Sequence, residues 1–122
     1  RAHRDDEASM NQLIAHLFGD FVLQSHVMAV EKVTSSAWCL LHAVMYCLPF
    51  LFLVTDAWQM AIIGGTHFFI DRYRLARRFK LRYERLWGGT EPFAAAPDWL
   101  SGWILIVVDN SFHLAVNALV LS

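Results

Sequence analysis

Charged residues are scarce in this 122-residue chain, where they make up 17% of the sequence, against about 25% in a typical soluble domain. Hydrophobic residues account for 57% of it, and the mean hydropathy is +0.38. Both departures favour a chain that lies in lipid over one that folds in water. The length leaves room for one domain.

Cysteine is rare as well, and the two that occur, Cys39 and Cys47, lie in one apolar segment. On a helix their spacing corresponds to about 12 Å of rise, which is too far for a disulfide. We therefore predict that both are small packing residues. The sequence also has no cysteine metal knuckle, no phosphate-binding loop and no nucleophile motif, so its chemistry must come from other residues.

Long apolar runs are what the sequence does have, and they occupy residues 10–30, 36–54, 57–70 and 99–121. A membrane-spanning helix needs about 17–25 residues, which the first, second and fourth runs provide. The third run continues as a helix into a basic stretch, and it reaches the same length only if arginines extend to the interface. Polar residues interrupt the first run, so it does not resemble a cleavable signal peptide. We predict an all-α fold, a polytopic membrane four-helix bundle with a short basic interfacial helix between helices three and four.

The ends of the chain and its basic residues predict the domain and its orientation. Residues 1–9 are polar and are predicted to be a tag or a disordered extension, which leaves residues 10–122 as a single four-helix transmembrane domain. Seven of the ten basic residues lie within residues 72–85. The positive-inside rule then places the 72–97 loop in the cytoplasm, with Lys32 on the same side and both termini outside. The same basic run suits binding to anionic lipid, and nucleic acid is the less favoured partner.

Three aspartates interrupt the apolar runs, although an ionisable group in a membrane helix costs about 2.5–3.5 kcal/mol on insertion scales. Each aspartate is four residues from a histidine, so both side chains lie on one helical face. The pairs are His16 with Asp20, His67 with Asp71, and, in reversed order, Asp109 with His113. Because successive spans alternate in direction, this reversal places the three histidines at one depth and the three aspartates one turn deeper. His42, in the second run, is predicted to lie level with the aspartates.

Imidazole and carboxylate together form the ligand set of transition metals. The predicted metal ligands are His16, Asp20, His42, His67, Asp71, Asp109 and His113. Zinc is the first candidate, with iron and manganese as alternatives. Seven candidates exceed the ligands of one catalytic zinc, so either two metals bind or some residues orient the others. Further polar residues on the same faces are predicted to form an outer layer, and these are Gln12, Gln24, Thr66, Asn110 and Asn117.

Two classes of function fit this pattern. The first is a metal-dependent hydrolase of a lipid-linked or amphiphilic substrate, in which Asp20, Asp71 and Asp109 supply the catalytic carboxylates. The alternative is a non-enzymatic membrane module, either an ion or proton conduit or an adaptor for another membrane protein, with a structural His/Asp network. A homo-oligomer or a membrane protein partner is compatible with both. A soluble four-helix bundle is the third possibility.

Four stretches of the sequence carry a family resemblance. They are AHLFGDFVLQ at 15–24, LLHAVMY at 40–46, THFFID at 66–71 and VVDNSFHL at 107–114. On these stretches the chain resembles the bacterial and phage membrane proteins catalogued as domain of unknown function 3307. The resemblance implies four helices in the bacterial inner (cytoplasmic) membrane and functional weight on the polar positions, and it supplies no reaction. The pattern is more loosely similar to membrane-bound metal-dependent hydrolases.

Overall fold

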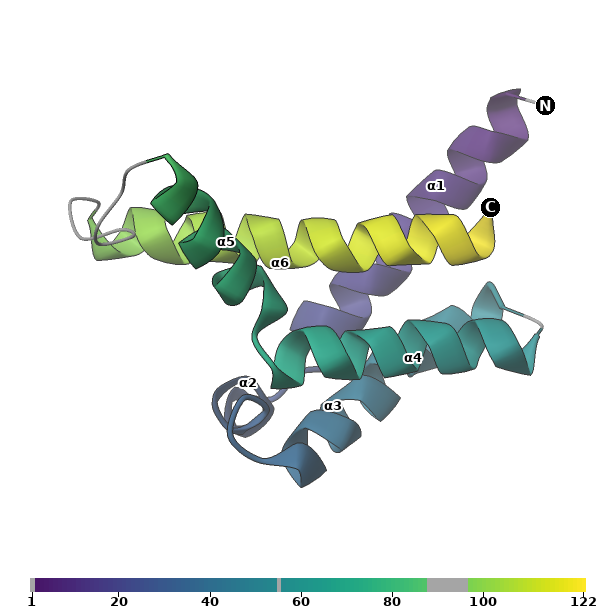
Figure 1. The fold of residues 1–122 in the computed structure, drawn as a ribbon. Coiled ribbons are helices and arrows are strands. Elements are labelled where there is room, and N and C mark those ends of the chain that lie inside the picture. The colour runs from purple at the N-terminus through teal and green to yellow at the C-terminus, as the bar shows by residue number, and fades with distance from the viewer. Residues whose placement is uncertain (1, 55, 88–96) are drawn as a thin grey trace.

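The structure, a computed structural model, describes residues 2–54, 56–87 and 97–122, and within these ranges every regular element is a helix (Figure 1). This confirms the all-α class. Residues 2–9, predicted to be a tag or a disordered extension, form the first turns of α1. The elements are α1 (Ala2–Leu17), η1 (Phe18–Val22), α2 (His26–Glu31), α3 (Ser36–Cys47), η2 (Leu48–Phe52), α4 (Ala57–Arg72), α5 (Leu75–Leu86) and α6 (Asp98–Leu121).

The first apolar run does not form the single helix expected over residues 10–30. Helix α1 widens into the π-helix η1, which contains Gly19, and the chain then turns before α2 begins. Ser25 caps α2, because its hydroxyl accepts a hydrogen bond from the Met28 backbone N–H at 3.2 Å. This N-cap fixes the start of a second helix within the apolar run and so divides the run in two.

The helix formed by the third run, α4, also ends earlier than expected. It stops at Arg72 and does not continue into the basic stretch. Arg74 adopts a left-handed backbone conformation, with φ of 51°, and the chain changes direction there before α5 starts at Leu75. A separate basic helix between the third and fourth apolar runs is therefore confirmed, although an elbow separates it from α4. Cys39 and Cys47 are both free, as predicted, and Cys39 is buried.

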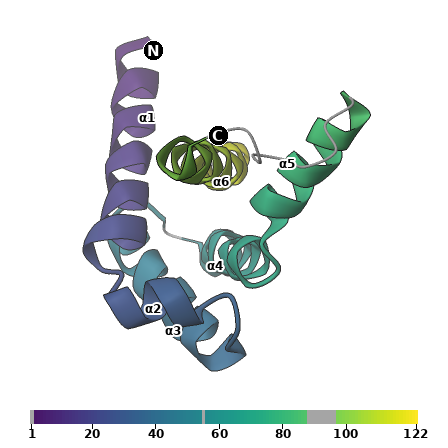
Figure 2. The ribbon, with the colours of Figure 1, turned by 90° about the vertical axis from the view of Figure 1, so that its left-hand side faces the viewer.

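The helices are not arranged as a regular up-and-down bundle. Helices α4 and α6 lie side by side and run in opposite directions, while α1 crosses α6 steeply (Figure 1). The view along α6 shows α1 and α5 on its two sides and α4 below it (Figure 2). Helix α5 packs on α6 through Phe79 and Phe112, whose ring centroids are 5.3 Å apart.

The lengths of the helices also differ from those expected of four membrane spans. Among the described helices, α6 alone is long and apolar enough to cross a membrane, and Ser36–Phe52 forms a shorter apolar helix. The break after η1 and the 16 residues of α4 explain why the other runs fall short. Helix length thus gives no support to a polytopic bundle.

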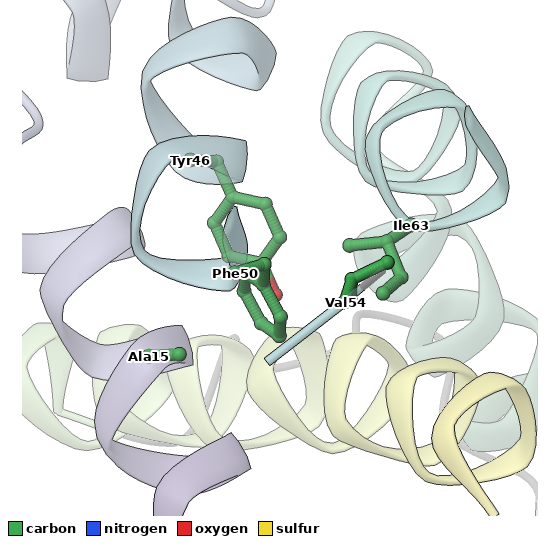
Figure 3. Packing of buried hydrophobic residues seen from close by; sticks show 5 residues of the cluster. All are labelled: Ala15, Tyr46, Phe50, Val54 and Ile63. Carbon is green, nitrogen blue, oxygen red and sulfur yellow. The ribbon is translucent and has the colours of Figure 1, made fainter. Parts of the chain in front are cut away.

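Many polar side chains lie inside this protein and many large apolar side chains lie outside, which is the opposite of a typical soluble domain. The apolar core is a small cluster where α1, α3, η2 and α4 meet, formed by Ala15, Tyr46, Phe50, Val54 and Ile63 (Figure 3). The other buried residues include four histidines, two aspartates and an asparagine. Large apolar side chains instead cover the outside, with Phe52 92% and Leu119 80% exposed. So many large exposed apolar side chains are typical of a protein that contacts lipid or another protein.

Candidate metal centre

Four of the predicted ligands converge at one buried point. Asp20 comes from η1 and His42 from α3, while His67 and Asp71 lie one turn apart on α4. All four residues are buried, and one ligand atom from each lies within 4.8 Å of the others. The predicted level of His42 is confirmed, since its Nε2 is 3.2 Å from carboxylate oxygens of both Asp20 and Asp71.

Several distances among these atoms are close to those of a metal ligand set. The Nε2 atoms of His42 and His67 are 2.9 Å apart, and His67 Nε2 lies 3.3 Å from Asp71 Oδ2 and 3.8 Å from Asp20 Oδ1. Metal–ligand bonds of about 2.0–2.2 Å in a tetrahedron place neighbouring ligand atoms about 3.3–3.6 Å apart. The 3.2–3.3 Å contacts lie close to this separation, while the two imidazole nitrogens are closer together and His67 is further from Asp20. The buried Asp and His groups could therefore hold a metal ion.

A second group of possible ligands shares Asp20 with the first. It consists of Asp20, Asp109 and His113, again with ligand atoms within 4.8 Å of one another. His113 Nε2 lies 3.4 Å from Asp109 Oδ2 and 3.2 Å from Asp71 Oδ1. Asp71 thus presents Oδ2 to the first group and Oδ1 to His113, so its carboxylate connects the two. Asp109 is the least enclosed member, with 27% of its side chain exposed.

Lys32 also belongs to the centre, which sequence reasoning missed because it gave this lysine only a topological role. Its Nζ lies 2.7 Å from Asp71 Oδ2, 3.9 Å from Asp20 Oδ1 and 3.4 Å from His42 Nε2. Burial alone would lower the pKa of the Lys32 ammonium, but the Asp71 and Asp20 carboxylates outweigh burial and raise the pKa. The loop that carries Lys32 is fastened by Arg72, which donates to Val33 O at 2.8 Å.

The charges of the centre do not balance while its histidines are neutral. The carboxylates of Asp20, Asp71 and Asp109 carry three negative charges, and Lys32 supplies one positive charge, which leaves an excess of two. An uncompensated charge is costly to hold in a buried site. One divalent cation, or two protons on the histidines, would restore neutrality.

His16 lies beside the centre, and the protein occupies both of its ring nitrogens. Asn110 donates through Nδ2 to Ile106 O, so its Oδ1 accepts a hydrogen bond from His16 Nε2 at 2.6 Å. His16 Nδ1 then accepts from the Tyr46 hydroxyl at 2.8 Å. Asn117 Nδ2 in turn donates to that hydroxyl oxygen at 2.7 Å. This chain suits His16 to an orienting role next to the ligands.

Tyr46 is a second residue that sequence reasoning missed. Its ring stacks on His67, with centroids 3.6 Å apart, and thereby fixes the plane of that imidazole. Gly19 makes this packing possible, because a Cβ there would lie 2.7 Å from Tyr46 O and 2.8 Å from its ring. The position of Tyr46, four residues after His42, places both side chains on one face of α3 and is the sequence feature that could have identified it.

The predicted outer layer is only partly seen. Asn110 and Asn117 hold the His16–Tyr46 chain. Gln12 donates to Leu114 O, and Thr66 donates to Ile62 O within its own helix, so neither contacts the centre. Gln24 has a buried Oε1 that accepts no hydrogen bond from the described residues.

A cavity of about 280 Å³ leads to the centre from the elbow between α4 and α5. Asp71 and Asp109 line it together with Lys32, and Arg74 and Arg77 contribute from the elbow and the first turn of α5. The carboxylates of Asp71 and Asp109 therefore line a cavity that opens to the outside.

Comparison with known proteins identifies a family. The family described as protein of unknown function (DUF3307) matches residues 9–121, which include every residue of the centre. No curated protein and no solved structure matches the chain. Because the match covers nearly the whole sequence, the chain belongs to this family, DUF3307.

Proposed function

We propose that this chain is a membrane-embedded metalloprotein whose His/Asp centre holds a divalent transition metal, with zinc as the first candidate. The observation that carries the proposal is the convergence of Asp20, His42, His67 and Asp71 at one buried point, with one ligand atom from each within 4.8 Å of the others. With neutral histidines, which metal binding requires, the site has an excess of two negative charges, and one divalent cation would neutralise it.

The distribution of side chains supports placement in a membrane. Helix α6 has the length and composition of a span, and its apolar side chains face outward. We propose that α6 crosses the bilayer and that the shorter apolar helices are embedded beside it, in the bacterial inner membrane. Helix α5 carries five of the ten basic residues and would lie on the anionic cytoplasmic leaflet, with the 72–97 loop inside and both termini outside.

Hydrolysis of a lipid-linked or amphiphilic substrate is the chemistry that this centre would best serve. A bound metal ion would polarise a water molecule. Asp109 is the residue suited to act as base, because it is partly exposed, lines the cavity and contacts His113. It would take a proton from the attacking water and return that proton to the leaving group, so that one water is consumed for each bond broken.

Lys32 favours a second candidate, a non-enzymatic module with a structural network or a proton path. Its ammonium already neutralises part of the carboxylate charge at the point where a metal would bind. With two protonated histidines the network would be neutral without any metal. In that case the cluster would hold the helices together or pass protons between its members.

Metal analysis of the full chain, purified in a non-ionic detergent, separates these candidates. We expect about one bound metal ion per chain, lost in His67→Ala and retained in His26→Ala, since His26 is exposed and outside the centre. Equal metal content in the two variants contradicts the proposal. A wild-type protein that contains no metal, and whose stability does not change when a chelator is added, contradicts it as well. Fractionation of cells tests the membrane placement, which requires the protein to remain with membranes after an alkaline wash.

A further inference from the structure

The cavity that reaches the centre has an unusual distribution of charge. At its inner end Asp71 pairs with Lys32, at 2.7 Å. The side chains of Arg74 and Arg77, which carry guanidinium groups and are exposed, line the same cavity. Within the described ranges neither guanidinium forms an ion pair, even though Asp71 and Asp109 line the same cavity.

Arg72, which precedes the elbow, differs from these two arginines because its guanidinium is held by hydrogen bonds. Its guanidinium donates to Val33 O at 2.8 Å and to Ser36 Oγ at 3.0 Å, so it serves to fasten the chain. Arg74 and Arg77, a few residues further on, are exposed and make no comparable contact in the described structure. Their charges therefore remain available to a ligand.

The backbone at the elbow adds to the same site. Arg74 is the one described non-glycine residue with a positive φ, 51°, a conformation that costs about 1–2 kcal/mol for an L-residue. This turn lets α5 begin at the cavity, and no side chain caps that helix. The first N–H groups of a helix lack intrahelical acceptors and favour a negative charge.

We propose that this cavity binds a phosphate group, which Arg74 and Arg77 hold at the mouth while the carboxylate-bound metal lies at the inner end. Guanidinium groups match phosphate oxygens in geometry as well as in charge. The inference rests on the proposed function, since the two cavity carboxylates belong to the proposed metal centre. It names the substrate class, a phosphate ester, whose phosphate comes from an amphiphile headgroup or from a free soluble phosphate compound.

The size and position of the cavity limit what can enter. Its volume of about 280 Å³ admits a small headgroup and excludes a whole lipid. Because α5 would lie at the membrane surface, an amphiphile could place its phosphate between the arginines while its chains stay in the bilayer.

The test compares two double variants of equal charge in the full-length, metal-loaded protein in maltoside detergent. Arg74→Gln with Arg77→Gln removes the cavity guanidiniums, and Arg78→Gln with Arg82→Gln removes two from elsewhere on α5. Calorimetry measures binding of dihexanoyl phosphatidic acid, of inorganic phosphate and of dihexanoylglycerol, which lacks phosphate.

We expect phosphatidic acid to bind the wild type, with about tenfold or greater loss in the cavity variant and less than about twofold in the control. Tighter binding of phosphatidic acid than of inorganic phosphate identifies a headgroup ligand, and equal binding identifies free phosphate. Equal losses in both variants, binding of dihexanoylglycerol as tight as that of phosphatidic acid, or no phosphate binding at all, overturns the inference.

The metal content of the same samples distinguishes a failure of the phosphate site from a failure of the proposed metal centre. Full metal occupancy without arginine-dependent phosphate binding overturns the phosphate site and leaves the metal centre standing. Absent metal overturns the proposed function, while the difference between the two double variants still decides for or against the phosphate site.

Discussion

The Lys32 ammonium lies 2.7 Å from Asp71 Oδ2, the same oxygen that faces the imidazoles of His42 and His67. The lysine thus stands at the edge of the volume in which a metal ion would bind. An internal ammonium and a divalent ion would repel each other there, although both satisfy the same carboxylates. This contact makes Lys32 the residue whose replacement best separates a metal centre from a metal-free network.

Lys32→Met should weaken the metal-free protein and tighten metal binding. Removing one partner of a buried ion pair costs about 3–5 kcal/mol, because the remaining carboxylates lose their counter-charge. With the repelling ammonium gone, a divalent cation should bind more tightly and restore the lost stability. Denaturant unfolding in detergent, with chelator and with zinc, measures both effects.

Lys80→Met is the matched control, since Lys80 pairs with Glu84 on the outside of α5. Such a surface pair contributes about 0.2–1 kcal/mol, and its loss should not depend on metal. If Lys32→Met is as unstable with zinc as with chelator, the cluster is a lysine-neutralised network instead of a metal site.

Gly19→Ala should disrupt the approach of η1 to α3. The new methyl group would lie 2.7 Å from Tyr46 O, a backbone atom that cannot rotate away. Overpacking of this kind costs about 1–3 kcal/mol, and the shift of η1 would carry Asp20 away from His42. The temperature of thermal unfolding and the metal content of Gly19→Ala should both fall.

Gly65→Ala provides the comparison, because a Cβ at Gly65 meets nothing within 4 Å. Alanine in the middle of a helix is more stable than glycine by about 0.5–1 kcal/mol, so this variant should gain stability. Similar behaviour of the two variants would show that the close contact at Gly19 has no energetic weight.

Tyr46→Phe separates the orienting chain from the ligands. The ring that stacks on His67 is kept, while the hydroxyl that joins His16 to Asn117 is lost. Leaving buried polar groups without partners costs about 1–3 kcal/mol. We expect Tyr46→Phe to lose this much stability and to keep its metal. Denaturant unfolding and metal analysis measure both, with Tyr83→Phe as the control because the Tyr83 side chain is exposed on α5. Complete loss of metal from Tyr46→Phe would mean that His16 or Tyr46 is itself part of the metal site.

Val107→Arg tests the membrane placement of α6. Val107 is exposed near the middle of this helix, where an arginine costs about 2.5–3.5 kcal/mol in a bilayer. The same change on a soluble surface is worth less than about 0.5 kcal/mol. We expect depletion from the membrane fraction for Val107→Arg and little change for Leu119→Arg, whose side chain can extend to the interface. Identical fractionation of the two variants would count against a spanning α6.

The proximity of the polar residues could be predicted from their spacing alone. Four-residue intervals fix a common helical face, and the reversed order of Asp109 and His113 suits a helix antiparallel to α4. Figure 1 shows α4 and α6 in that relation. The level of His42 followed from its place early in the second run, and the 3.2 Å contacts confirm it.

Other features depend on contacts that spacing does not encode. The π-helix at Gly19 and the elbow at Arg74 are local backbone choices, determined by the close approach of Tyr46 and by the packing of α5 on α6. Lys32 reaches the centre because α2 folds back, which a continuous helix over residues 10–30 would not allow. The available indication in the sequence was that Lys32 is a lone lysine between apolar runs whose three aspartates need a counter-charge.

X-ray absorption at the metal edge, on full-length protein purified without added metal, tests the central claim most directly. We predict a bound divalent transition metal with two imidazole nitrogens and carboxylate oxygens at about 2.0–2.2 Å, an environment lost in His67→Ala. Protein free of metal, or a metal whose shell contains no imidazole, would contradict a His/Asp metal centre.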